Sequence, residues 1–537
     1  MEVHNIQTAI VPAEGEKARV RIKMELSKKS RIKLFMFLVI LNIILRFQVV
    51  QNEIGWDSFL MHIMTNSLTE YGYARWWLHP LSVFELYPAS YTSTMHFILS
   101  GIEQTTGLEM RWVIFLYCVF IGLLSMFTSY LMAGEIFDND LFKLLVAFGF
   151  STSPGVLGYT TWTVPTRGLF VVLAPLLIYM LLKCRLSIKY APLTFILTAF
   201  LFATHHLFYF LIPSFLIFLI LIIYFKLRSK IGVIIKNRTS KLTPFIPVCG
   251  FLCMYSIPFF TGHFIEGGSR YAPVWEGHIR YIGVLIIPAI GGLLYLVFKQ
   301  IKSLEEWFIL LSAISLITFI YIPTYLKWFL PIFVIPLSCI GLINIMKLKI
   351  RRALLVVILF LLLALSFSSY YQFIHFLPSP GMRGMHARYM EDSTYQTGRW
   401  MKYHLNGSAV SNDLTLGRRI LAASETSHVL TGSTTCDLIY NFIHLNLSEF
   451  RRYPITSEDF WFDGYEGPDV GERVWDYIHS YYGKLRLFNI SYIIENKKCG
   501  GNVYWHHGNF PSKPLHFAYD KVSSVYDCGN IGIWKIR

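Results

Sequence analysis

The chain has 537 residues, of which 54% are hydrophobic and only 15% are charged. About a quarter of the residues in a typical soluble domain are charged, so this composition excludes an ordinary soluble globular protein. Apolar runs of about 20 residues, the length that crosses a bilayer core, recur along most of the chain. The sequence therefore predicts a polytopic membrane protein.

The net charge of +15 does not indicate binding to nucleic acid. Lys and Arg gather in the N-terminal segment and in short loops between apolar runs, where such residues set orientation in the membrane. No glycine-rich phosphate loop and no Cys/His spacing typical of a zinc framework occurs in the sequence. The first apolar run is long and no small-residue cleavage site follows it, so we expect an anchor rather than a cleaved signal.

The apolar runs predict a polytopic α-helical membrane domain of about eleven spans. The predicted spans are 34–50, 111–132, 141–158, 167–183, 191–204, 207–225, 243–260, 281–298, 307–323, 328–346 and 353–371. With this count, the basic N-terminus and the basic loops after spans four, six, eight and ten all lie on one side, which the positive-inside tendency makes cytoplasmic. We expect a multi-pass protein of the cell membrane or an endomembrane, with a cytoplasmic N-terminus and an extracytoplasmic C-terminal tail.

Three regions follow from this topology. Residues 1–33 form a basic cytoplasmic N-terminus, residues 34–371 a transmembrane domain with a large first outer loop at 51–110, and residues 372–537 an extracytoplasmic soluble domain. The tail is polar and aromatic, and its patterns predict a mixed α/β fold. The predicted strands are 409–412, 492–495 and 531–536, and the predicted helices are 395–404 and 471–482.

Asp57 stands just past the first predicted span, at the end of the run Glu53-Ile-Gly-Trp-Asp57. A carboxylate at the membrane surface, in a loop too long to be a mere connector, is suited to general-base chemistry at the lipid boundary. The alternative is that Asp57 caps a surface helix beginning at Ser58. We interpret Glu53 as a solvated acid, and Arg46 as a residue that extends its charge from the first span to the membrane surface.

Other polar residues share the predicted outer boundary. The candidates for substrate binding are Glu85, His205, His206, Arg270, Arg280 and Lys327. A sugar carried on a polyprenyl phosphate presents an anionic phosphate there, which Arg270, Arg280 and Lys327 are suited to bind, while the spans provide a hydrophobic groove for the lipid tail. The simpler alternatives are an exposed loop acid for Glu85, the polar closure of a hairpin for the two histidines, and an anchor to lipid head groups for Arg270.

Together these features resemble the GT-C superfamily of membrane glycosyltransferases. In the first outer loop of oligosaccharyltransferase catalytic subunits, an acid is followed by a short amphipathic helix, a Gly-Tyr aromatic stretch and Tyr-Pro. The similar elements here are Trp56-Asp57, the helix to Glu70, Tyr71-Gly72-Tyr73-Ala-Arg-Trp76-Trp77 and Tyr87-Pro88. The tail segment 398–420 also resembles the opening of their soluble domains. The resemblance implies a GT-C-like fold, transfer with inversion at the sugar carbon, and Asp57 as the base.

The chain departs from oligosaccharyltransferases at two places. The loop 159–167 lacks the second acidic pair that helps to hold a divalent metal in that family, and Val410-Ser-Asn-Asp413 stands where their Trp-Trp-Asp-Tyr-Gly motif is expected. The sequence therefore favours a monosaccharide transferase that takes its sugar from a polyprenyl- or dolichyl-phosphate donor. No cofactor is firmly implied, and a divalent metal (Mg or Mn) stays an open alternative.

The expected partners are a lipid-linked sugar donor, a glycan, lipid or protein acceptor, and membrane lipids, with no nucleic acid. Three alternative functions stay open: an oligosaccharyltransferase-like enzyme of protein glycosylation, a lipid or sugar transporter, and a non-catalytic membrane scaffold. The predicted spans are poor in acids and no repeat is evident, which disfavours a transporter. The missing acidic pair is the best support for a scaffold.

Overall fold

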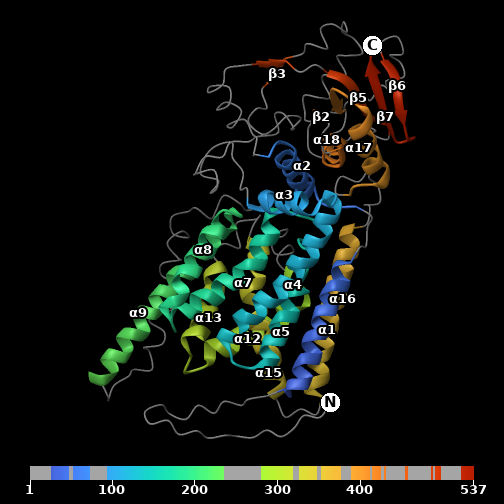
Figure 1. Ribbon diagram of the computed structural model, residues 1–537. Helices are drawn as coiled ribbons and strands as arrows, with labels where there is room; N and C mark the ends of the chain where they lie inside the picture. Colours follow the sequence, from blue (N-terminus) through green and yellow to red (C-terminus); the bar gives the residue numbers. More distant parts are fainter. Residues whose placement is uncertain are drawn as a thin grey trace, which may run out of the picture.

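The computed structural model describes residues 26–47, 52–72, 94–234, 280–317, 326–347, 352–376, 389–411, 414–424, 429–430, 454–456, 485–487, 490–497 and 522–537. A bundle of helices forms one part of the molecule, and a small sheet with two helices lies beyond one end of it (Figure 1). The bundle helices are α1 (Lys28–Arg46), α4 (Met110–Ile136), α5 (Asp140–Ser151), α6 (Pro154–Leu157), α7 (Thr166–Cys184), α8 (Ala191–Phe202), α9 (Ile212–Ile234), α12 (Ile286–Phe298), α13 (Leu304–Ile317), α14 (Leu326–Phe329), α15 (Pro331–Lys347) and α16 (Ala353–Phe376). Short 3-10 turns are η2 (Ile188–Tyr190), η3 (His206–Leu211) and η4 (Gly283–Leu285).

Five helical stretches of the described chain are long and apolar enough to cross a membrane. They are Met110–Ile136, Thr166–Cys184, Leu207–Leu227, Arg280–Phe298 and Ala353–Tyr370. Large apolar side chains also point outward from the bundle: Ile40 on α1 is 53% exposed, and Leu219 on α9 and Leu359 on α16 are each 56% exposed. Helices that are apolar toward both their neighbours and the outside are typical of a bundle surrounded by lipid, which supports a membrane location.

The predicted count of eleven spans stays a prediction. Helices occur at ten of the predicted positions, and the span predicted at 243–260 lies outside the described residues. The span predicted at 141–158 is divided into α5 and α6. Pro154 begins α6 and has no backbone N–H to continue the hydrogen bonds of α5, which explains why the chain bends there.

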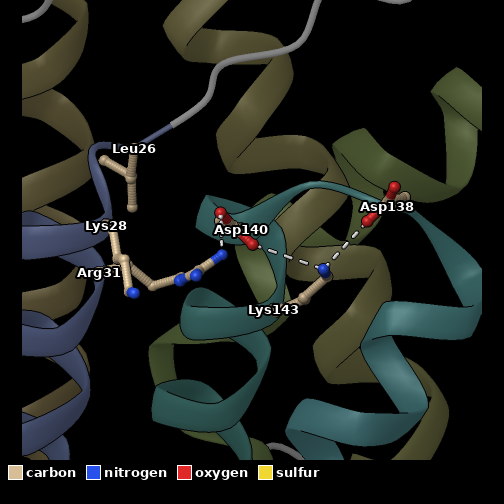
Figure 2. A pocket seen from close by; sticks show the side chains of 6 residues that line it. All are labelled: Leu26, Lys28, Arg31, Asp138, Asp140 and Lys143. Atoms are coloured by element: carbon tan, nitrogen blue, oxygen red, sulfur yellow. Dashed lines mark hydrogen bonds and ion pairs between the residues drawn. The ribbon is translucent and has the colours of Figure 1, made fainter.

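Ion pairs join the helices at the end of the bundle where α1 begins (Figure 2). Arg31 on α1 pairs with Asp140 at the start of α5 at 3.0 Å, and Lys143 pairs with Asp138 at 3.0 Å and with Asp140 at 3.4 Å. These groups and Lys28 line a polar pocket. The charges hold the start of α1 beside the turn from α4 to α5, far from α2.

Two helices of the first outer loop, α2 (Trp56–Tyr71) and α3 (Thr94–Thr106), lie across the opposite end of the bundle (Figure 1). Beyond them are α17 (Asp392–His404) and α18 (Leu414–Ser424). A five-stranded sheet of order β2-β1-β5-β7-β6 lies next to these helices, with β2 (Val429–Leu430) and β5 (Ile490–Asn496) parallel to β1 (Ser408–Ser411), and β7 (Ile531–Ile536) antiparallel to β5 and to β6 (Val522–Asp527). A separate short pair joins β3 (Pro454–Thr456) and β4 (Leu485–Leu487).

The mixed α/β character predicted for the tail agrees with this sheet. The strands predicted at 409–412, 492–495 and 531–536 correspond to β1, β5 and β7, and the helix predicted at 395–404 corresponds to α17. The helix predicted at 471–482 lies outside the described residues. The three regional boundaries and the side of the membrane on which the tail lies stay predictions.

Candidate active site

The backbone before α2 fixes the position of Asp57. Gly55 precedes the helix with a φ of 103°, a conformation that favours glycine, and the N–H of Ile54 donates to the carbonyl of Trp162 at 2.8 Å. A Cβ atom at Gly55 would also lie 2.9 Å from Oγ1 of Thr163. The helix begins at Trp56, so Asp57 lies in its first turn and is not the cap, and the capping alternative for Asp57 is wrong.

Asp57 forms an ion pair with Arg167. Arg167 lies in the first turn of α7, after Pro165, whose fixed φ suits the entry to a helix. The guanidinium lies over the ring of Trp328 at 4.4 Å and over the ring of Tyr159 at 5.3 Å. The Arg167 side chain is 16% exposed and that of Asp57 is 44% exposed, so the acid occupies the more open side of the pair.

A second cation lies over one of these rings, that of Trp328. The ammonium of Lys327 on α14 lies 4.9 Å from the centre of the Trp328 ring and 5.4 Å from that of Tyr281. Tyr281 and Tyr159 stack at 6.3 Å, with their hydroxyl oxygens 3.4 Å apart. We call Arg167, Lys327, Tyr159, Tyr281 and Trp328 the cation–aromatic cluster.

Four distant parts of the chain form this arrangement: α2, the turn after α6 with the start of α7, Tyr281 two residues before η4, and α14. Aromatic faces stabilise nearby cations, which keeps both charges in place without pairing each to a carboxylate. Asp57 pairs with Arg167, and the second cation, Lys327, lies over the same Trp328 ring, so the described part of the cluster carries two cations beside one carboxylate. The site can hold an anionic group and can place a proton acceptor next to it.

The structure places the other predicted substrate-binding residues in different ways. His205 is buried before η3, its Nδ1 accepts a hydrogen bond from the N–H of Leu207 at 3.0 Å, and its ring lies 6.5 Å from that of Phe170. Its role in substrate binding stays a prediction. His206 begins η3, and its side chain lies outside the described residues. Arg280 is exposed and directly precedes Tyr281, at the edge of the cation–aromatic cluster. Glu85 and Arg270 lie outside the described residues.

The interpretation of Glu53 as a solvated acid is wrong. Its side chain is 3% exposed, and Oε1 lies 2.7 Å from Nδ1 of His62. The hydroxyl of Ser58 donates to Oε2 at 3.3 Å and accepts from the N–H of Val164 at 3.0 Å. Ser58 and His62 are four residues apart and share one face of α2, so the carboxylate of Glu53 holds that face against the turn before α7.

The interpretation of Arg46 as a residue that reaches the membrane surface is also wrong. Arg46 is fully buried and donates to Oδ1 of Asn42 at 2.7 Å, to the carbonyl of Ser151 at 2.9 Å and to Oγ1 of Thr160 at 3.0 Å. Several oxygen acceptors satisfy the guanidinium inside the bundle, so it has no need to reach water. Arg46 thereby fixes the turn that carries Tyr159 of the cation–aromatic cluster.

The described residues do not fit a tightly bound divalent metal. No group of three or more His, Cys, Asp or Glu side chains gathers among them. The two acids nearest the start of α2 are engaged otherwise, since Asp57 pairs with a guanidinium and Glu53 with an imidazole. We derive no step through a metal ion.

Comparison of the chain with known proteins identifies its fold. No model of a protein family matches the sequence, and no curated protein matches it. Solved structures do match. The oligosaccharyltransferase of Archaeoglobus fulgidus matches with a TM-score of 0.52 and 13% sequence identity, over 88% of this chain and 70% of that one. ArnT of Cupriavidus metallidurans matches with a TM-score of 0.52 and 10% sequence identity, over 95% of this chain and 98% of that one. The chain has the GT-C fold. A mycobacterial arabinofuranosyltransferase, AftD, matches with a TM-score of 0.52 and 13% identity, over 96% of this chain but 42% of its own.

The GT-C fold confirms the fold expected from the first outer loop. At 10% to 13% identity these matches establish architecture, while the chemistry rests on the residues of the site. Sequence analysis identified Asp57 and Lys327 but missed Arg167. The signal for Arg167 is a single cation two residues after Pro165, at the outer end of a predicted span.

Proposed function

We propose that the protein is a membrane glycosyltransferase that takes a sugar from a polyprenyl- or dolichyl-phosphate donor on the outer face of the membrane. The observation that carries this proposal is the placement of Asp57 against the cation–aromatic cluster at one end of an apolar bundle. The phosphate of the donor binds at the two cations, and the lipid tail lies along the apolar helices. A matching archaeal oligosaccharyltransferase structure, at a TM-score of 0.51 and 11% identity, contains a dolichol-phosphate, which supports a lipid phosphate as a ligand.

The proposed step is a direct displacement at the anomeric carbon. Asp57 accepts the proton of the acceptor hydroxyl, and the hydroxyl oxygen forms the new bond to the sugar. The bond from the anomeric carbon to the phosphate oxygen breaks, and its electron pair stays on the lipid phosphate. The configuration at the sugar carbon inverts because attack and departure occur on opposite faces.

Arg167 and Lys327 act on the leaving group in this proposal. The phosphodiester of the donor has one negative charge, and the departing lipid phosphate gains a second. Cations positioned where negative charge increases lower the barrier of such a step. The tail would hold the acceptor, since α18 contacts α2 through a hydrogen bond from Nδ2 of Asn66 to the carbonyl of Ala422 at 2.9 Å.

A test with labelled donors separates the candidate functions. The purified protein in lipid nanodiscs receives polyprenyl-phosphate monosaccharides, with a membrane extract of the expressing cell as the source of acceptor. We expect transfer of the sugar with release of polyprenyl phosphate, and a donor KM that rises about tenfold in Lys327→Gln through the loss of a charged contact. Absence of transfer from every monophosphate donor would contradict the proposal.

The archaeal match favours a second candidate, an oligosaccharyltransferase-like enzyme. Such an enzyme would require a lipid-linked oligosaccharide and a divalent ion, and a related matching structure contains zinc and sulfate. Transfer of an oligosaccharide to peptide that EDTA abolishes would support it. Flux of lipid or sugar across sealed vesicles without transfer would instead indicate a transporter, and neither activity would indicate a scaffold.

A further inference from the structure

The ion pair of Asp57 and Arg167 joins the proposed base to a proposed phosphate ligand. We propose that the phosphate of the donor takes Arg167 from Asp57, so that the carboxylate becomes available as a base only when the donor is bound. This inference rests on the proposed function and adds an order to it: donor first, then acceptor. Arg167 becomes the residue that couples donor binding to base activity.

The contacts of Arg167 permit this exchange. Its guanidinium is held by the faces of Trp328 at 4.4 Å and Tyr159 at 5.3 Å, which do not depend on Asp57. Tyr159 lies one residue from Thr160, which Arg46 fixes at 3.0 Å. The cation therefore stays in place when its carboxylate partner leaves.

The exposure of the two partners determines which of them moves. Arg167 is 16% exposed and is enclosed by rings, whereas Asp57 is 44% exposed in the first turn of α2. A pair that is open to solvent on one side is weak, because water screens it and competes for the charges. A small gain in binding energy elsewhere is enough to separate Asp57 from Arg167.

The phosphate supplies that gain. The phosphate oxygens can accept paired hydrogen bonds from the Arg167 guanidinium and can also contact the ammonium of Lys327. The phosphate can therefore contact two cations, whereas the Asp57 carboxylate pairs with Arg167 alone. Both cations lie within 4.9 Å of the centre of the Trp328 ring, and the exchange requires that one phosphate contact both. During transfer the departing phosphate gains charge while Asp57 becomes neutral by taking the proton, which strengthens the hold of Arg167 on the phosphate.

The exchange predicts competition that binding measurements detect without turnover. The probe is dolichyl phosphate, titrated against protein in nanodiscs, with wild type, Asp57→Asn, Arg167→Gln and the double variant. Asp57→Asn removes the competitor, so we expect it to bind dolichyl phosphate about fivefold more tightly, the upper range for a partly exposed ion pair. In the Arg167→Gln background, Asp57→Asn should leave the Kd unchanged.

Two controls separate this exchange from a general effect of charge. In a Lys327→Gln background the gain from Asp57→Asn should persist, because that background keeps Arg167. Asp138→Asn, which removes an acid from an ion pair at the opposite end of the bundle, should not change the Kd (Figure 2). Thermal unfolding of each variant verifies that it is folded.

The result that overturns the exchange is an unchanged or weaker affinity in Asp57→Asn, or an equal gain in the Arg167→Gln background. These outcomes are distinct from failure of the proposed function. If Asp57→Asn loses transfer but keeps the wild-type Kd, Asp57 is the base and the exchange is wrong. If the wild type neither binds dolichyl phosphate nor transfers sugar, the proposed function itself fails.

Discussion

At the scale of residues, two acids four positions apart have different environments. Asp57 is half-exposed and faces a cation, while Glu53 is buried and faces His62. A buried carboxylate that is paired and hydrogen-bonded orders the backbone around it, whereas an exposed one is free to exchange partners. Glu53 thus positions the start of α2, and Asp57, the more exposed acid, is the one that we propose as the base.

A buried histidine on α3 gives a prediction about pH. Burial lowers the pKa of His96 from 6.5 to about 4, against the opposing effect of a hydrogen bond to the backbone of Met61. The unfolded chain therefore binds a proton below pH 6.5 that the folded protein does not bind. Stability falls as the pH decreases from about 6.5 toward 4, by up to about 1.4 kcal/mol per pH unit.

The measurement is the midpoint of thermal unfolding between pH 7 and pH 4.5 for the wild type and His96→Leu. We expect a shallower decrease in His96→Leu, because the substitution removes the proton uptake. His404→Gln, at an exposed position in the last turn of α17, is the control and should keep the wild-type slope. Equal slopes in the wild type and His96→Leu would contradict the role of His96.

The sequence predicted one part of the site and not the other. Asp57 could be identified because an acid shortly after a membrane span is unusual. The GT-C resemblance also depends on an acid at that place in the first outer loop. Arg167 is 110 residues away, and its pairing with Asp57 depends on how α2 and α7 pack, which no local pattern encodes. The burial of Arg46 was missed for the same reason, since it donates to Ser151 and Thr160, which are 105 and 114 residues along the chain. Glu53 pairs with His62, nine residues away, but that contact depends on how the chain turns into α2.

At the scale of elements, Arg46 ties α1 to the turn that carries Tyr159. Gly122 on α4 leaves the space that the Arg46 side chain occupies, and a Cβ atom there would overlap the guanidinium. We expect Gly122→Ala to displace Arg46 from Thr160, to lower the midpoint of thermal unfolding and to reduce sugar transfer, because overpacking a well-filled bundle typically costs about 1 to 3 kcal/mol.

Gly134→Ala, on the same helix, is the matched control. A Cβ atom there would meet only the flexible side chain of Lys143, at 3.6 Å. Its unfolding midpoint should stay within the range of the wild type. If Gly122→Ala were as stable and as active as Gly134→Ala, the link from Arg46 to the site would be wrong.

The helices themselves were largely predictable from the sequence. Long apolar runs gave α4, α7 and α16 within a few residues, because membrane helices need a fixed length of apolar chain. The division of α5 from α6 depends on Pro154 inside a run that is apolar throughout. Apolar content alone therefore predicted a single span at 141–158, whereas the backbone there forms two helices, α5 and α6.

At the scale of the whole molecule, the tail is connected to the helix that carries Asp57. The N–H of Met390 donates to the carbonyl of Glu53 at 3.3 Å, and Arg399 on α17 pairs with Glu109 before α4 at 3.4 Å. An acceptor held by the tail would therefore be presented at the end of the bundle where Asp57 lies. This arrangement requires the tail and the site to share one side of the membrane.

Cys528, in the turn between β6 and β7, allows a test of that side. It is a free, exposed thiol. In sealed vesicles of known orientation, a membrane-impermeant maleimide should label a variant in which Cys528 is the only tail cysteine, when the extracytoplasmic face is outward. Adding Cys528→Ser should abolish that signal. Labelling only when the cytoplasmic face is outward would place the tail and the site in the cytosol.

The most direct test of the account is the rate of a single turnover by Asp57→Asn. Protein is used in excess over a labelled polyprenyl-phosphate sugar that the wild type uses, at a concentration that binds all of the donor. Addition of acceptor then reports the chemical step apart from binding. We predict a rate at least about 100-fold below that of the wild type, the range expected for loss of a general base, in a variant that still binds the donor. A rate within a few-fold of the wild type would show that Asp57 is not the base.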